Sequence, residues 1–186
     1  MRVAPGDKLY SEAHTRKVLI VSDSMCRGIR RPELMAELKS HGMDIDISIR
    51  RHAGAQTHEL HHHAQQSIED ERPHGMILVG GTNDLSRRNG RRQLTDEEIA
   101  NNLLATGEAA RAQGVTNIFI SSVIHRTGHY YERRNVIINR FIEEGCRQRG
   151  FIFINNNNIR VYHTDGLHLN DEGTSLLKTN IINRMY

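Results

Sequence analysis

Short runs of consecutive apolar residues alternate along this chain with longer segments that have helical periodicity. The runs at 17–22, 75–80 and 115–123 are apolar without alternation, which is typical of parallel strands covered on both faces. The segment at 44–50, Asp-Ile-Asp-Ile-Ser-Ile-Arg, alternates apolar and polar residues with a period of two and indicates an edge-like strand. A short fifth strand is predicted at 151–154.

Five further segments can form helices that present an apolar face. The clearest one opens with Thr95-Asp-Glu-Glu98, which has the form of a capping box, and ends at Gly114, a typical stop signal. The predicted helices cover residues 33–41, 57–69, 95–113, 131–149 and 171–184.

Strands that alternate with helices predict a three-layer α/β domain around a five-stranded parallel sheet. We assign residues 17–186 to this single domain and residues 1–16 to an N-terminal extension. A chain of 186 residues can bury a sizeable core without disulfides or metals to cross-link it. The sequence shows no internal repeat and no sign of a second domain.

The positions of several polar residues and one glycine converge on one edge of this predicted sheet. Ser24 directly follows the first strand, Gly54 lies a few residues after the second, and Asn83 follows the third. Sites in parallel sheets form at the carboxyl ends of the strands, so these residues are expected on one rim. Asp165 and His168 lie before the last helix, in a loop that can fold back over that rim.

Ser24, His168 and Asp165 are the residue types of a serine nucleophile, its base and the carboxylate that orients the base. His168 can take the proton of Ser24 and later return it to the leaving group. Asp165 can accept a hydrogen bond from the other ring nitrogen and thereby fix the tautomer. Each residue also has a plainer interpretation: Ser24 as a helix cap, Asp165 as a turn residue and His168 as a surface residue.

Three donors are candidates for an oxyanion hole: the backbone amides of Ser24 and Gly54 and the side-chain amide of Asn83. Ser24 is expected at a strand-to-helix turn, where free backbone N–H groups suit an oxyanion. Gly54 has no side chain, so a substrate oxygen can approach the backbone closely. The plainer interpretations are a loop glycine for Gly54 and a turn residue for Asn83, with Asp84 ordering the same loop.

A group of histidines after the second strand raises the alternative of a metal site: His52, His58, His61, His62 and His63. His58 and His62 lie four residues apart on one helical face, but His-Glu-Leu-His at 58–61 is one residue short of the His-Glu-x-x-His spacing. A solvated helix face is the favoured interpretation. No metal or cofactor is therefore predicted.

Composition and charge bound the remaining possibilities. The formal net charge is +3, and much of the positive charge lies in arginine clusters that can bind phosphate groups. The clusters are Arg27, Arg30 and Arg31; Arg50 and Arg51; Arg87, Arg88, Arg91 and Arg92; and Arg126, Arg133 and Arg134.

Cys26 and Cys146 are too few for a disulfide framework and are expected to behave as small apolar residues. No apolar run approaches the roughly 20 residues that cross a bilayer, and no signal peptide is evident, so a cytoplasmic location is expected.

Four short motifs resemble the blocks that define the SGNH (GDSL-type) hydrolase family: Asp23-Ser24, Gly54, Gly81-Thr-Asn-Asp84 and Asp165-Gly-Leu-His168. Their order and spacing follow the family over nearly the whole chain. One departure is Ser22, which stands where the family usually has glycine.

This resemblance implies a flavodoxin-like fold and hydrolysis of carboxylic esters through an acyl-enzyme, without a cofactor. It gives Ser24 the role of nucleophile, His168 that of base and Asp165 that of its partner. It also makes Gly54 and Asn83 oxyanion donors beside the Ser24 amide.

The sequence thus supports a serine esterase acting on acetyl or short-chain lipid esters as the first hypothesis. Within the family, the phrases at 79–86 and 165–173 are similar to the esterase-like domains of animal non-long-terminal-repeat retrotransposons. The alternative hypothesis is a catalytically vestigial domain of the same fold that binds RNA through its arginine clusters. A third is a peripheral lipid-binding domain, although the sequence shows no strong amphipathic anchor.

Overall fold

The structure, a computed structural model, describes residues 15–86, 90, 92–160, 162 and 164–186. The predicted N-terminal extension lies outside the described residues except for its last two, and Arg16 already belongs to the first strand. The strands are β1 (Arg16–Ser22), β2 (Ile45–Arg51), β3 (Gly75–Val79), β4 (Asn117–Ser121) and β5 (Ile152–Ile154). The helices are α1 (Arg31–Ser40), α2 (Thr57–Glu71), α3 (Asp96–Ala112), α4 (His129–Arg149) and α5 (Asp171–Met185). Two short 3₁₀ helices, η1 (Ser24–Cys26) and η2 (Thr82–Leu85), follow β1 and β3.

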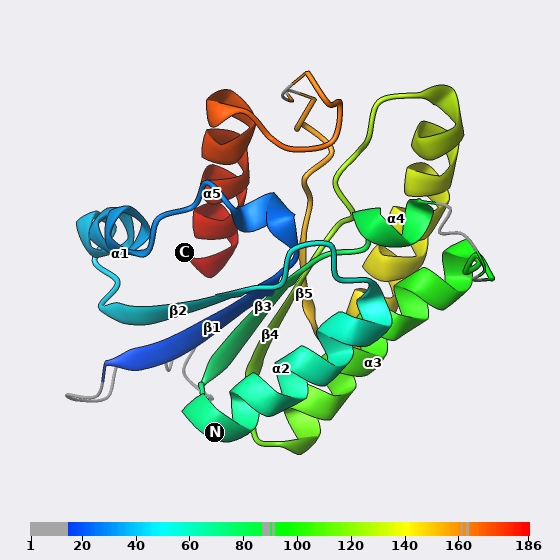
Figure 1. Cartoon of the computed structure of the whole chain (residues 1–186). Helices are drawn as coiled ribbons and strands as arrows, with labels where there is room; N and C mark the ends of the chain where they lie inside the picture. The colour runs from blue at the N-terminus through cyan, green and yellow to red at the C-terminus, as the bar shows by residue number, and fades with distance from the viewer. Residues whose placement is uncertain (1–14, 87–89, 91, 161, 163) are drawn as a thin grey trace, which may run out of the picture.

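The five strands form one parallel sheet in the order β2-β1-β3-β4-β5 (Figure 1). This is the strand order of flavodoxin-like folds and confirms the predicted fold class. The strand with alternating polarity, β2, lies at an edge of the sheet, as its pattern indicated. The fully apolar strand β3 lies at the centre and is buried along its whole length.

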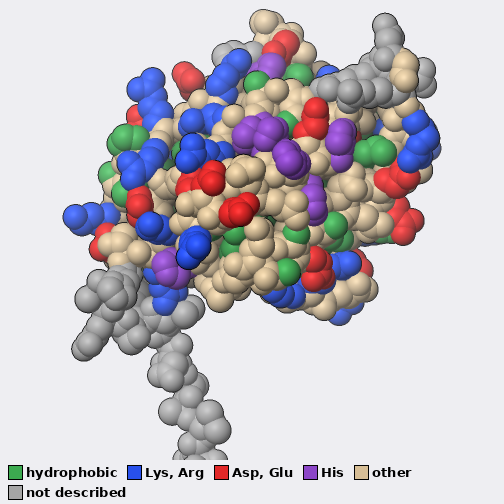
Figure 2. All heavy atoms as spheres, turned by 60° about the horizontal axis from the view of Figure 1, so that its bottom comes forward, with side chains coloured by type: hydrophobic (Ala, Val, Ile, Leu, Met, Phe, Trp, Pro, Cys, Tyr) green, Lys and Arg blue, Asp and Glu red, His purple; other side chains and the backbone are tan. Residues whose placement is uncertain are grey.

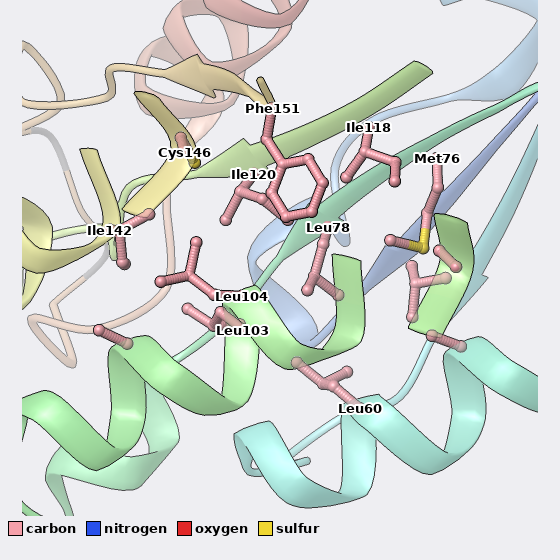
Figure 3. Close-up of a cluster of buried hydrophobic side chains, with 14 of the residues drawn as sticks. Leu60, Met76, Leu78, Leu103, Leu104, Ile118, Ile120, Ile142, Cys146 and Phe151 are labelled. Carbon is pink, nitrogen blue, oxygen red and sulfur yellow. The ribbon is translucent and has the colours of Figure 1, made fainter. Parts of the chain in front are cut away.

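Helices cover both faces of the sheet, which explains why the central strands lack alternation. Leu19 and Val21 of β1 pack into a cluster with residues of α2, α3 and α4. Figure 3 labels Leu60, Leu104 and Ile142 of these helices. Val18 and Ile20 of the same strand pack on the other side with residues of α1 and α5. Because successive side chains point to opposite faces, a strand covered on both sides has to be apolar at every position.

One predicted boundary was too wide. The fourth strand was expected at 115–123, but β4 spans only Asn117–Ser121. Val115 and Val123 are buried nonetheless, so the apolar pattern continues beyond the strand. The backbone N–H of Val115 donates to Ala110 at the end of α3, and that of Val123 donates to the side chain of Asn139. The apolar pattern therefore does not show at which residues the strand begins and ends.

Candidate active site

Ser24 begins the 3₁₀ helix that directly follows β1. Asp23 caps this helix: its side chain accepts a hydrogen bond of 2.9 Å from the backbone N–H of Met25, while its own N–H donates to Val79 of β3. Ser22 is fully buried, and its hydroxyl donates to the backbone oxygen of Asp23, so this departure from the family pattern is accommodated. Ser24 thus occupies a tightly fixed turn on the rim, and the capping residue is Asp23 instead.

The structure brings Ser24, His168 and Asp165 together although 144 residues separate the first two. The Oγ atom of Ser24 lies 3.1 Å from Nε2 of His168, and Nδ1 of His168 lies 2.6 Å from a carboxylate oxygen of Asp165. A hydroxyl, an imidazole and a carboxylate therefore form one hydrogen-bonded chain. This is the geometry in which a histidine can take a proton from a serine while a carboxylate holds the ring.

The carboxylate of Asp165 is itself held by a short local turn. One oxygen accepts hydrogen bonds from the backbone N–H groups of Leu167 and His168, and the other lies against the His168 ring. The hydrogen bond with His168, followed by those backbone donors, keeps the pKa of Asp165 well below its usual range. The side chain is therefore ionised at neutral pH, as the partner of a histidine base should be.

Gly54 lies in the loop between β2 and α2, and contacts of His52 in this loop and of Arg51 at the end of β2 hold the loop in place. The backbone N–H of His52 donates to Ser22 at 2.7 Å, and the ring of His52 stacks on that of His63 with centroids 3.7 Å apart. The guanidinium of Arg51 donates to backbone oxygens of Cys26 and Ile29, just beyond Ser24. Gly54 has φ +73°, a conformation that glycine adopts without strain. The loop is thus tied directly to the segment that carries Ser24.

Asn83 lies in η2, and its side-chain amide donates to the backbone oxygen of Ala55 at 3.0 Å. The Asn83 side chain is therefore directed toward the loop of Gly54. An amide group carries two N–H donors, and the bond to Ala55 uses one of them. The structure places Asn83 and the Gly54 loop next to each other.

Asp84, the next residue, anchors η2 to the start of α2. Its carboxylate accepts hydrogen bonds from the backbone N–H of Thr57 at 3.0 Å and from the Thr57 hydroxyl at 2.8 Å. Burial raises the pKa of Asp84 above its usual value, although both bonds from Thr57 counteract the shift. The prediction that Asp84 orders this loop is confirmed.

Sequence reasoning did not single out Asp23 beyond its motif. This residue is fully buried, and among the described residues no partner reaches its second carboxylate oxygen. Burial raises its pKa from 3.8 to about 7, and the nearby charge of Asp84 adds to the shift. The position of Asp23 in the sequence could have indicated its role, because an aspartate between a buried strand and a serine is a strong candidate for a helix cap.

The cysteines and the described histidines were the other candidates for a chemical site. Burial raises the pKa of both Cys26 and Cys146 to about 12, which leaves almost no thiolate at neutral pH and confirms that they are buried, apolar side chains. Figure 2 shows histidine side chains gathered on one face. Within the described ranges, however, no three His, Cys, Asp or Glu side chains are arranged to hold a metal ion.

Comparisons with known proteins point to one family. The model of the GDSL-like Lipase/Acylhydrolase family matches residues 23–176, which include every candidate residue. A lipase/acylhydrolase from Enterococcus faecalis has a TM-score of 0.78 at 14% identity, over 92% of this chain and 95% of that one. A GDSL-like lipase from Bacteroides thetaiotaomicron has a TM-score of 0.71 at 17% identity, over 92% and 89%. An acetyl xylan esterase has a TM-score of 0.74 at 15% identity, over 91% and 100%. These three structures share the fold of this chain. A comparison with curated proteins found no match.

Proposed function

Since this chain belongs to the GDSL-like lipase/acylhydrolase family, we propose that it is a serine esterase that hydrolyses acetyl or short-chain acyl esters through Ser24. The observation that carries the proposal is the chain of hydrogen bonds from Ser24 through His168 to Asp165, at 3.1 and 2.6 Å. Asp23 already caps η1, so capping does not explain the presence of Ser24 at this position. A capping role would also not require an imidazole within hydrogen-bond distance of the Ser24 hydroxyl.

The first half of the reaction forms an acyl-enzyme. The Ser24 oxygen bonds to the ester carbonyl carbon while Nε2 of His168 takes the hydroxyl proton. The carbonyl electron pair moves to the oxygen, which the backbone N–H groups of Ser24 and Gly54 and the amide of Asn83 stabilise. The tetrahedral species then collapses, the alcohol leaves with the proton from His168, and the acyl group stays on Ser24.

The second half repeats these steps with water. His168 takes a proton from the water as its oxygen attacks the acyl carbon, and then returns a proton to Ser24 as the acid leaves. Asp165 remains ionised throughout and stabilises the positive charge that His168 carries in both halves. No cofactor is needed for this chemistry.

Hydrolysis of p-nitrophenyl acetate and butyrate by purified protein tests the proposal. Ser24→Ala and His168→Ala should each lower kcat to near the uncatalysed rate, whereas Ser40→Ala, an exposed serine on α1, should retain it. Circular dichroism checks that the variants fold. Equal slow turnover in all four proteins would contradict a serine mechanism.

The RNA-binding alternative has less support. Several arginines of the predicted clusters are paired with carboxylates: Arg31 with Asp46, Arg50 with Glu71, Arg92 with Glu98, and Arg134 with Asp96. Paired guanidinium groups are less available to phosphates. Arg87, Arg88 and Arg91 lie outside the described residues. Salt-dependent retardation of single-stranded RNA, together with absent esterase activity, would favour this alternative.

Two narrower hypotheses rest on the sequence alone. The similarity to retrotransposon esterase-like domains has no support beyond the two phrases at 79–86 and 165–173. The peripheral lipid-binding hypothesis likewise rests on the sequence alone, and none of the helices in the described segments has the length and apolar character to cross a bilayer.

A further inference from the structure

One arginine lies between the two loops that carry the proposed catalytic residues. Arg126 belongs to the segment between β4 and α4. Its Nη1 atom donates to the Ser86 hydroxyl and lies 3.4 Å from the backbone oxygen of Thr82, so it borders the helix η2 that carries Asn83. The next residue, Thr127, donates to Gly166 from its backbone N–H at 3.2 Å.

Those two sets of contacts place Arg126 at the rim beside the candidate active site. Gly166 lies between Asp165 and His168, and the Thr127 hydroxyl also donates to its backbone oxygen, at 3.2 Å. Figure 1 shows the segment before α4 running up beside the orange loop that precedes α5. The guanidinium of Arg126 is thus bounded by the Asn83 helix on one side and connected through Thr127 to the His168 loop on the other.

The charge of Arg126 is not neutralised by a carboxylate of any described residue. Its described partners are the oxygens of Thr82 and Ser86 and the ring of Tyr131, whose centroid lies 4.6 Å from the guanidinium carbon. The neighbouring Arg134, by contrast, pairs with Asp96 at 2.5 Å. A guanidinium presents five N–H donors, and the hydrogen bonds to Thr82 and Ser86 both use Nη1.

We infer that Arg126 binds an anionic group of the ester substrate, a carboxylate or a phosphate-like group on either its acyl or its alcohol part. A planar guanidinium held by an aromatic ring and two oxygens is preorganised, so little side-chain entropy is lost when it pairs with such a group. The inference rests on the proposed esterase function and adds a substrate class to it: charged esters over neutral ones.

The competing interpretation is that Arg126 only tethers the segment before α4 to η2. A tether would affect all substrates alike, whereas an anion-binding residue would affect charged esters more than neutral ones. The discriminating quantity is therefore the ratio of kcat/KM for a charged ester to that for its neutral counterpart, which is p-nitrophenyl butyrate for an anion on the acyl part and methyl 4-acetoxybenzoate for an anion on the leaving group. Two charged esters separate the positions of the anion: mono-p-nitrophenyl succinate carries it on the acyl part, and 4-acetoxybenzoate carries it on the leaving group.

We expect the wild type to prefer at least one charged ester over its neutral counterpart, and Arg126→Gln to lower that ratio about tenfold, the effect of losing one charge-assisted hydrogen bond. Arg126→Lys should retain part of the preference because it keeps the charge. Arg147→Gln, which removes an exposed arginine paired with Glu144 at the far end of α4, is the matched control and should leave the ratio unchanged.

A wild type without preference for either charged ester, or an Arg126→Gln variant in which charged and neutral rates fall in parallel, would overturn the inference. Failure of the esterase proposal is recognised separately, by turnover of p-nitrophenyl acetate that does not depend on Ser24. In that case calorimetric titration of the Ser24→Ala protein with succinate and with benzoate still decides the matter. Binding that Arg126→Gln weakens about tenfold supports the anion site, and absence of binding rejects it.

Discussion

Asp165 holds both the backbone and the ring of His168 with a single carboxylate. One oxygen accepts from the His168 N–H at 2.9 Å, and the other lies 2.6 Å from Nδ1 of the ring. The intervening Gly166 has φ +65°, which lets the chain turn tightly enough for this double contact. The orientation of the proposed base is therefore fixed within four consecutive residues, and only Ser24 has to be brought from elsewhere.

Asp165→Asn should keep the turn but impair the orientation of His168. The amide oxygen can still accept from the backbone, but the amide nitrogen brought toward Nδ1 would favour the wrong tautomer, as it does in serine proteases with this substitution. We expect kcat on p-nitrophenyl acetate to fall on the order of 10²- to 10⁴-fold. Asp171→Asn, at an exposed position in the first turn of α5, is the control. An Asp165→Asn enzyme with wild-type kcat would remove Asp165 from the mechanism.

Asn83→Ala should remove one of the proposed oxyanion donors. Loss of a single donor of this kind costs about 10²- to 10³-fold in kcat, with a smaller change in KM. The same change removes the hydrogen bond to Ala55, so unfolding by urea has to be measured beside the kinetics. Asn101→Ala, an exposed asparagine on α3, controls for the substitution itself. If kcat falls only as far as the folded fraction does, Asn83 is a structural residue.

The fold could be predicted from the sequence because its signals are local. The continuous apolar run of β3 and the capping box at Thr95 each lie within a few residues, and the structure contains both where they were expected. The rim position of Ser24 followed from the parallel sheet alone.

The interactions that complete the site could not be predicted in this way, because they join residues far apart in the chain. The bond between Thr57 and Asp84 spans 27 residues, and that between Arg126 and Ser86 spans 40. Many polar pairs have the same composition and spacing, so no sequence pattern selects these two. The burial of Asp23 likewise depends on how β1 and β3 pack, which periodicity does not reveal.

Thr57→Val should destabilise the protein, whereas Thr57→Ser should not. Valine matches threonine in shape but removes the hydroxyl that donates to Asp84 and accepts from the amide of Asn102. A buried carboxylate that loses a donor costs about 1–3 kcal/mol of unfolding free energy. Urea denaturation measures the difference, and the serine variant, which keeps both bonds, is the matched control. Equal stability of Val and Ser variants would contradict the assigned role of the hydroxyl.

Gly81→Ala should be costly for two separate reasons. Gly81 has φ +105°, and a Cβ atom there would lie 2.7 Å from a methyl group of Val123. Gly42→Ala is the matched control, because Gly42 has φ +77° but nothing within 4 Å of the added carbon. The control should lose about 1–2 kcal/mol from the backbone conformation alone, and Gly81→Ala should lose more. Because Gly81 precedes Asn83 in η2, kcat should fall only in the Gly81 variant. Similar losses at both positions would show that Val123 yields without cost.

Asp23→Asn should change how stability depends on pH. Burial raises the pKa of Asp23 from 3.8 to about 7 in the folded protein, so between about pH 4 and pH 7 the folded state binds more protons than the unfolded state. The contribution of Asp23 to the free energy of unfolding is therefore fully present below about pH 4. It decreases as the pH rises to about 7 and is absent above that pH. The shift corresponds to roughly 4 kcal/mol at most, since one pKa unit is worth about 1.4 kcal/mol.

Asparagine cannot ionise, and its side-chain oxygen can still accept from Met25 as a helix cap. Urea unfolding at a series of pH values should show that wild-type stability declines between about pH 4 and pH 7 relative to Asp23→Asn, with the two curves parallel above about pH 7. Asp44→Asn, at an exposed position before β2, should follow the wild-type curve. Parallel curves for wild type and Asp23→Asn over the whole range would mean that Asp23 ionises in the folded protein as readily as in the unfolded chain, and that its buried carboxylate has a partner or a path to water.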